Sequence, residues 1–146
     1  MFKFKLQSVL EYRQNVEEKI LNDYSELRRR LETEKELLKK LIAEREGLTN
    51  ELRQMKNTLL RAQDIASMVA YVEAIRKKQH EQENLIHEVK GLVEDKRKEL
   101  VEAVKNRKVM ENLKERQAEE YRKNTSDLEQ KNSDEMAILK FGRRET

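Results

Sequence analysis

The chain of 146 residues has no cysteine, no proline and no tryptophan, and it contains only three glycines. Without cysteine it can form no disulfide, which is typical of proteins from a reducing compartment. Turns are built mainly from glycine, proline, asparagine and aspartate, so a chain with so little glycine and proline folds back rarely. These absences argue against many short elements and favour a few long helices.

Long apolar runs are also missing. No stretch approaches the roughly 20 apolar residues that a membrane-spanning helix needs. The first residues, Met1 to Leu6, lack the apolar core of a signal peptide. We therefore expect a cytoplasmic protein whose contact with a membrane comes only through its partners.

Charged residues are abundant, because 42% of the chain is charged and 36% is hydrophobic. The 32 basic and 29 acidic residues leave a net charge of only +3, and the two signs are interspersed. This pattern is typical of a solvated helix surface. A protein that binds nucleic acid more often has a one-sided basic block, and the run Arg28-Arg29-Arg30 is short. Nucleic acid is therefore not the expected partner.

Apolar residues recur in alternating steps of four and three, which is the seven-residue repeat of a left-handed coiled coil. The first seam runs through Ile20, Tyr24, Leu27, Leu31, Glu34, Leu38, Leu41, Arg45, Leu48, Leu52, Met55, Leu59, Ala62, Ala66 and Val69. The second, weaker seam runs through Val72, Ile75, Gln79, Gln82, Ile86, Val89, Val93, Lys96, Leu100, Ala103, Arg107 and Met110. Two seams in one chain predict an all-α fold, a long antiparallel two-helix coiled-coil hairpin.

The sequence places the bend of this hairpin near residues 62–70. Asp64 and Ser67 can each cap a helix N-terminus through a side-chain oxygen. Helix one is then expected at about 3–63 and helix two at about 67–128. Because no glycine or proline forces a turn there, one continuous helix is the alternative.

Folding the chain about residue 67 brings the seam positions of one helix onto those of the other. Leu41 then meets Val93, and Leu48 meets Ile86. Both seams are regular, so this agreement supports the hairpin without proving its register.

Polar residues inside a seam can fix its register at a cost in stability. In the predicted register Arg45 lies near Glu88, and Glu34 lies one layer from Lys96. The alternative is that these long side chains bend outward to water.

The seven-residue repeat decays in the last third of the chain. The polar stretches 123–127 and 132–134 are expected to fray or break the helix, and Gly142 can end a short amphipathic piece. The predicted division is a coiled-coil hairpin at 1–128 and an amphipathic segment with a flexible tail at 129–146.

No pattern in the sequence indicates catalysis. The two histidines, His80 and His87, are seven residues apart, whereas metal ligands on one helix are usually three or four apart. The chain has neither a glycine-rich phosphate loop nor an acid and base pair with a pocket around it. We predict no catalytic residue, no metal site, no cofactor and no small-molecule substrate, and therefore a binding protein that is not an enzyme.

Apolar side chains beyond the two seams point to a partner. They are Leu21, Leu37, Ile42 and Leu60 in the first helix and Leu85, Leu92, Val101 and Val104 in the second. A stripe wider than one seam is typical of a helix that packs on a third helix or in a groove. Aromatic residues such as Phe2, Phe4 and Tyr71 are favoured anchors in interfaces. The alternative is that the extra residues only widen the seam.

Several pieces of the chain, in their order, resemble the flagellar export protein FliJ family. The stretch from Phe2 to Arg13 matches the F-x-F-x-L-x-x-V-L-x-x-R start of that family. Similar too are Leu38-Lys39-Lys40-Leu41-Ile42, Ile65-Ala66-Ser67 followed by Tyr71-Val72 and Ile75, Glu115-Arg116-Gln117, and Asp134-Glu135-Met136-Ala137. The resemblance covers nearly the whole chain, although no single motif in it is specific.

The resemblance implies a soluble component of the flagellar type III protein export apparatus, with a role in flagellum biogenesis and motility. Proteins of this family are antiparallel coiled coils similar to the central stalk of rotary ATPases. They bind the export ATPase ring and the cytoplasmic region of the export gate, and they help to return export chaperones for reuse. The chain would then be cytoplasmic and peripheral at the inner face of the cell membrane, through the export apparatus.

The resemblance also suggests which residues bind. The expected ATPase-binding residues lie at the terminal end and are Phe2, Phe4, Leu6, Leu10, Arg13, Ile138 and Phe141. The expected export-gate-binding residues are Leu41, Tyr71 and Ile75. The chain departs from the family pattern at Leu37, Glu44, Lys78 and Gln82, positions that belong to the gate-contacting face in the resemblance.

Two other hypotheses remain open at this point. One is a structural coiled coil that associates with itself through the flanking apolar residues. The other is a helical protein associated with nucleic acid, suggested by the isoelectric point near 9.0 and the run Arg28-Arg29-Arg30. Loss of RNA or DNA binding with rising salt would indicate the second of these.

Overall fold

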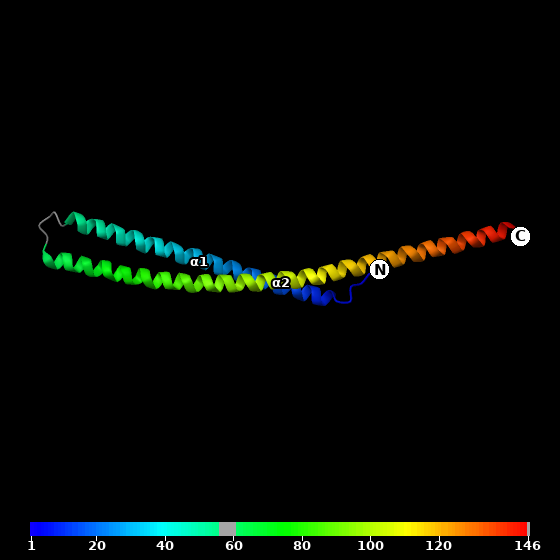
Figure 1. Cartoon of the computed structure of the whole chain (residues 1–146), viewed down its shortest axis with the longest axis horizontal. Coiled ribbons are helices and arrows are strands. Elements are labelled where there is room, and N and C mark those ends of the chain that lie inside the picture. The colour runs from blue at the N-terminus through cyan, green and yellow to red at the C-terminus, as the bar shows by residue number, and fades with distance from the viewer. Residues whose placement is uncertain (56–60, 146) are drawn as a thin grey trace. The chain divides into compact units, whose positions relative to one another are not determined.

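The computed structural model describes residues 1–55 and 61–145. It contains the helices α1, Gln7–Met55, and α2, Ala62–Glu145, and no strand among the described residues (Figure 1). Contacts divide the chain into two units. We call residues 1–18 with 101–146 the terminal unit, and residues 19–100 the hairpin unit. The all-α two-helix hairpin that the sequence predicted is confirmed.

In the hairpin unit the two helices run antiparallel. Near the start of α2, the Tyr71 hydroxyl donates a hydrogen bond of 2.9 Å to Glu44 Oε1. Further along α2, Lys96 Nζ lies 4.0 Å from Asp23 Oδ2. The residue number therefore falls along α1 as it rises along α2, which defines the antiparallel arrangement.

The predicted seams form the contact between the helices. Every seam position from Ile20 to Met55 is half-buried, and every one from Val72 to Met110 is buried or half-buried. The most buried residues of the hairpin unit are Val72, Ile75, Ile86 and Val89, whose side chains are exposed by 6%, 3%, 6% and 1%. The seven-residue repeat was therefore a correct guide to the buried face of both helices.

The predicted bend at residues 62–70 is wrong, because these residues belong to α2. The Arg61 carbonyl accepts hydrogen bonds from the amides of Asp64 and Ile65, so α2 begins at Ala62 and Asp64 stands in its first turn. A carboxylate there interacts favourably with the helix dipole without capping the end. Helix one is described up to Met55, and the predicted residues 56–60 lie outside the described residues, whereas the predicted residues 62 and 63 belong to α2.

The side chains explain this shift. The sequence continued the first seam through Ala62, Ala66 and Val69, but all three are exposed. Instead Ile65 and Met68 are half-buried and extend the second seam toward the start of α2. Burying isoleucine and methionine removes more apolar area from water than burying two alanines, which favours the observed arrangement.

The predicted register is also wrong. The Gln82 side-chain amide donates to the Glu34 carboxylate at 2.5 Å, whereas folding about residue 67 would have set Gln82 opposite Leu52. Lys96 pairs with Asp23 and with Glu99, and not with a residue near Glu34. A seven-residue repeat allows several alignments that place apolar on apolar, so the repeat alone could not select one.

The terminal unit ties the start of the chain to α2. Phe4 and Leu10 are exposed by only 7% and 3%. Lys114 Nζ donates to Gln7 Oε1 at 2.9 Å, and Arg107 on the seam forms an ion pair with Glu17. Residues 1–6 precede α1, so its start is later than the predicted residue 3.

α2 continues to Glu145 with no break at 123–127 or 132–134, so the predicted end near residue 128 is wrong. Gly142 lies inside the helix and does not have the positive φ of a helix-ending glycine. Glycine in a helix interior is unfavourable by only ~1 kcal/mol relative to alanine, and the surrounding residues are good helix formers. The division of the chain at residues 128 and 129 stays a prediction.

Candidate partner-binding surfaces

Tyr71 is the one expected gate-binding residue that presents most of its side chain to solvent, with 52% of its surface exposed. Its hydroxyl donates to Glu44, and this hydrogen bond, together with the negative charge of the carboxylate, raises the pKa of Tyr71. Leu41 is half-buried and Ile75 is 3% exposed, because both lie on the seam. The structure therefore gives Leu41 and Ile75 a packing role beneath a surface that contains Tyr71.

More apolar residues lie on the same side of the hairpin unit. Seven-residue spacing returns to the same face, so Leu85 and Leu92 follow Tyr71 along α2, and Leu37 precedes Glu44 along α1. Leu37 and Leu92 are 45% and 47% exposed, and Leu85 is half-buried. We call Leu37, Tyr71, Leu85 and Leu92 the Tyr71 flank.

Two departures from the family pattern take part in contacts. Glu44 holds the Tyr71 hydroxyl, and Gln82 donates to the side chain and the backbone carbonyl of Glu34. Both contacts join α1 to α2, so these residues act on the alignment of the helices. The sequence could have indicated these contacts through position alone, because Gln82 is on the seam and Glu44 is next to it.

The expected ATPase-binding residues at the start of the chain differ in exposure. Phe4 and Leu10 are buried, Phe2 and Arg13 are half-buried, and Leu6 is 40% exposed. Phe4 and Leu10 therefore have a packing role in the terminal unit, and little of either side chain is accessible to a partner.

Tyr121 is a residue of this region that the sequence did not single out. Its ring lies 5.7 Å from that of Phe2, and the amino group of Met1 donates a hydrogen bond of 2.9 Å to its hydroxyl. This hydrogen bond and the positive charge of the amino group lower the pKa of Tyr121. The sequence indicated this contact only weakly. Tyr121 lies four residues after Gln117, which continues the spacing of the seam, but in the part of the chain where the repeat decays.

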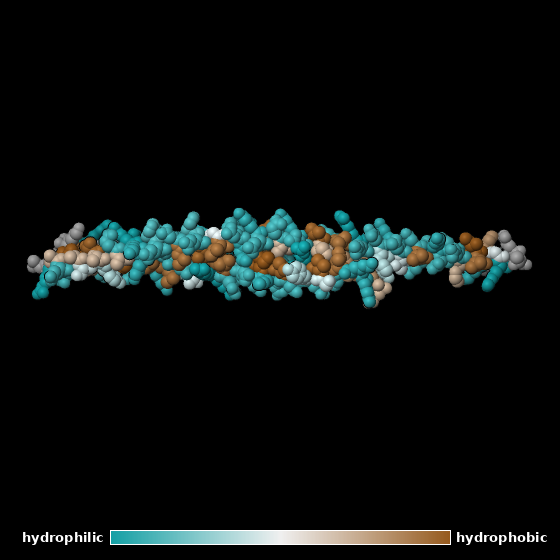
Figure 2. Space-filling view, turned by 90° about the horizontal axis from the view of Figure 1, so that it is seen from below, coloured by the Kyte–Doolittle hydropathy of each residue, from teal (hydrophilic) through white to brown (hydrophobic). Residues whose placement is uncertain are grey.

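Ile138 and Phe141 do not join the N-terminal residues. They lie beyond Tyr121 on α2, and 17 residues of helix from Tyr121 to Ile138 rise about 25 Å. Their side chains are 70% and 66% exposed, so they form an accessible apolar surface near the end of α2 (Figure 2). The predicted ATPase-binding set therefore divides into a packed N-terminal group and an open C-terminal group.

The comparisons with known proteins identify the family. The family described as "Flagellar FliJ protein" matches residues 2–146. The chain belongs to the FliJ family. This membership confirms the resemblance that the N-terminal motif and the later pieces suggested, and it makes the chain a component of flagellar type III export.

A solved structure is similar to this FliJ-family chain. It is CT670 from Chlamydia trachomatis, described as a YscO homolog, and it is 27% identical in sequence. The match covers 95% of this chain and 94% of that chain, with a TM-score of 0.51. No match was found among curated proteins.

The FliJ family consists of structural export components. The candidate binding residues of this chain accordingly lie on surfaces of the two units. Among residues 1–55 and 61–145, no cluster of His, Cys, Asp or Glu side chains could hold a metal ion. No helix in that same part of the chain is long and apolar enough to cross a membrane.

Proposed function

We propose that this FliJ-family chain is a non-enzymatic connector that binds the export ATPase ring with its terminal unit and the export gate with its hairpin unit. The observation that carries the proposal is the pair of exposed apolar surfaces, one in each unit. Ile138 and Phe141 form the first, and the Tyr71 flank forms the second. Exposed apolar and aromatic side chains are the usual anchors of protein interfaces.

The helix α2 gives the connection a physical basis. It carries both Tyr71 and Phe141, and it runs without a break through Ala62–Glu145. Two proteins bound at these positions would be joined by a single helix. Such a connector couples ATP hydrolysis to export without performing chemistry, and it leaves the remaining surface for export chaperones. A place at the inner face of the cell membrane would follow from its partners.

The C-terminal surface is tested with the export ATPase of the same organism. Replacing Ile138 and Phe141 together by asparagine removes two apolar anchors, so we expect affinity for the ATPase to fall about tenfold or more. Stimulation of ATP turnover by the chain should fall with it. Binding is measured by pull-down and titration, and turnover by phosphate release.

The matched control replaces two other exposed apolar residues of α2, Val109 and Leu128, which are 64% and 61% exposed. It should bind and stimulate as the parent chain does. Equal loss in both double variants would show that general hydrophobicity matters and would remove Ile138 and Phe141 from the interface. If the parent chain neither binds the ATPase nor stimulates it, and forms dimers instead, the scaffold hypothesis takes its place.

The Tyr71 flank is tested with the cytoplasmic region of the export gate protein. The substitution Tyr71→Ala removes an aromatic side chain that is 52% exposed and one hydrogen bond to Glu44, so helicity should be unchanged while gate affinity falls about fivefold to tenfold. Circular dichroism measures the first and titration the second.

Tyr12, which is 65% exposed on α1, provides the control for this experiment. Tyr12→Ala should bind the gate as the parent does. Tyr71→Phe separates the ring from the hydroxyl that bonds to Glu44. Gate binding that is equal for Tyr71→Ala and the parent would exclude Tyr71 from the contact.

A further inference from the structure

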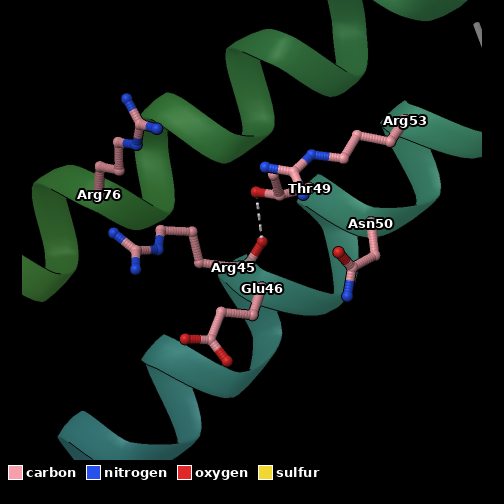
Figure 3. A pocket seen from close by; sticks show the side chains of 6 residues that line it. All are labelled: Arg45, Glu46, Thr49, Asn50, Arg53 and Arg76. Carbon is pink, nitrogen blue, oxygen red and sulfur yellow. Dashed lines mark hydrogen bonds between the residues drawn. The ribbon is translucent and has the colours of Figure 1, made fainter.

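A polar hollow lies between the two helices of the hairpin unit, on a different flank from Tyr71. It has a volume of about 440 Å³, and its lining residues are Arg45, Glu46, Thr49, Asn50 and Arg53 of α1 and Arg76 of α2 (Figure 3). Every one of these side chains is polar or charged. Three arginines against one glutamate give the hollow a positive charge, so its chemistry suits an anionic group.

The arginines that line the hollow come from both helices. Arg45 extends from α1 toward α2, which carries Arg76, and Arg53 extends back along α1 toward Thr49 (Figure 3). The Thr49 hydroxyl donates to the backbone carbonyl of Arg45 at 2.8 Å, which leaves the Arg45 guanidinium uninvolved.

Two of these arginines, Arg45 and Arg53, lack a carboxylate partner among the described residues. Arg97 pairs with Glu94 and Arg122 pairs with Glu119, each at 2.8 Å or less. In the part of the chain that the structure describes, the guanidinium groups of Arg45 and Arg53 have no hydrogen bond or ion pair.

Among residues 1–55 and 61–145, Arg76 pairs only with Glu73, at 3.2 Å through one nitrogen, so the other donors of its guanidinium group have no partner there. A guanidinium group carries five donors and recognises carboxylates with two parallel hydrogen bonds. Open forks in a hollow are therefore a potential site for oxyanions.

The position of Arg45 strengthens this inference. It stands on the seam and is half-buried, where an unpaired charge lowers stability. An oxyanion bound in the hollow would satisfy Arg45 and would relieve the repulsion among the three guanidinium groups. Part of the binding free energy would thus come from removing an unfavourable interaction that is present in the free chain.

The spacing of the arginines selects the kind of anion. Arg45 and Arg53 are eight residues apart on α1, so their backbones are separated by about 12 Å along the helix. Side chains that leave the helix this far apart can be met by several carboxylates along one peptide. The acidic residues Glu46, Glu51 and Glu73 lie within a turn of the arginines in sequence, so the positive charge is confined to the hollow, which suits a short acidic segment better than a long polyanion such as nucleic acid.

We propose that the hollow lined by Arg45, Arg53 and Arg76 binds a short acidic peptide segment of a partner protein. The site is distinct from the Tyr71 flank. Tyr71 of α2 and Glu44 of α1 mark the Tyr71 flank, whereas Arg76 of α2 and Thr49 of α1 line the hollow. In each helix the two residues are five positions apart, which is about 140° around the helix axis. The hairpin unit therefore has room for one partner on its apolar flank and for an acidic segment on the other.

The test uses the full chain and a short fluorescein-labelled peptide of alternating glutamate and alanine. The pocket variant combines Arg45→Gln, Arg53→Gln and Arg76→Gln. Glutamine keeps the helix and is tolerated on the seam, where Gln79 and Gln82 already stand. The control variant, Arg29→Gln with Arg30→Gln and Arg61→Gln, removes the same charge from exposed positions outside the hollow.

Fluorescence anisotropy should show that the pocket variant binds the acidic peptide about tenfold more weakly than the parent, which is about 1.4 kcal/mol. The control variant should bind within twofold of the parent, and the peptide with glutamine in place of glutamate should not bind. Equal loss of peptide affinity in both variants would show that net charge alone explains the binding, and it would overturn the site. Tighter binding of inorganic pyrophosphate or of a labelled single-stranded DNA than of the peptide, lost in the same pocket variant, would overturn the peptide as the ligand.

Discussion

Val89→Asp should destabilise the hairpin unit by about 3–5 kcal/mol. Val89 is the most buried residue of the described chain and is only 1% exposed. A carboxylate introduced at this position would lose most of its hydration. An uncompensated charge in such a position is among the most destabilising single changes. Urea denaturation followed by circular dichroism measures the loss, and the thermal midpoint should fall with it.

Val109→Asp is the matched control, because Val109 is also on α2 and is 64% exposed. The two variants share the lower helix propensity of aspartate, so that effect cancels in the comparison. Val109→Asp should cost less than about 1 kcal/mol. Similar denaturation midpoints for the two variants would show that Val89 does not lie in the seam and that the alignment of the helices is different.

Leu10→Ala should destabilise the terminal unit by about 2–4 kcal/mol. Leu10 is 3% exposed, and a buried leucine replaced by alanine loses its transfer free energy and leaves a cavity. Hydrogen exchange of the amides in residues 7–18 should become faster, because opening of this unit becomes less costly. The same variant should bind the export ATPase more weakly only to the extent that the unit is open.

Leu6→Ala separates stability from binding. Leu6 belongs to the same expected ATPase-binding set but is 40% exposed, so the substitution should cost less than about 1 kcal/mol. If Leu6→Ala weakens ATPase binding while exchange in residues 7–18 is unchanged, Leu6 contacts the partner directly. Exchange that is unaffected by Leu10→Ala would contradict the packing role of Leu10.

The buried face of each helix could be predicted from the sequence because it depends on a local period. From Ile20 to Met55, the residues expected on the seam are half-buried, including the polar Glu34 and Arg45. A side chain's direction around a helix is set by its position in the turn, so burial follows from spacing. The family was also accessible from the order of short motifs, although no single one was specific.

The site residues were less predictable. Tyr71 was expected at a surface and is found there, but Leu41 and Ile75, which share its motif, are packed in the seam. A seam residue and a partner-binding residue can both be apolar, and only the exposure of the side chain separates them. The hollow lined by Arg45 and Arg76 joins residues 31 positions apart, and no local pattern connects them.

By itself, then, the sequence determined the all-α class, the two seams and the family of this protein, since each depends on residue types at short spacing. The bend, the register and the length of α2 were decided only by the tertiary structure. One helix can slide along the other by whole steps of the seven-residue repeat and still place apolar residues on apolar residues. The alignment is therefore selected by a few contacts, such as the pair Glu34 and Gln82 and the burial of Ile65 and Met68. Those contacts join residues far apart in the chain, and their energies exist only once the two helices lie side by side.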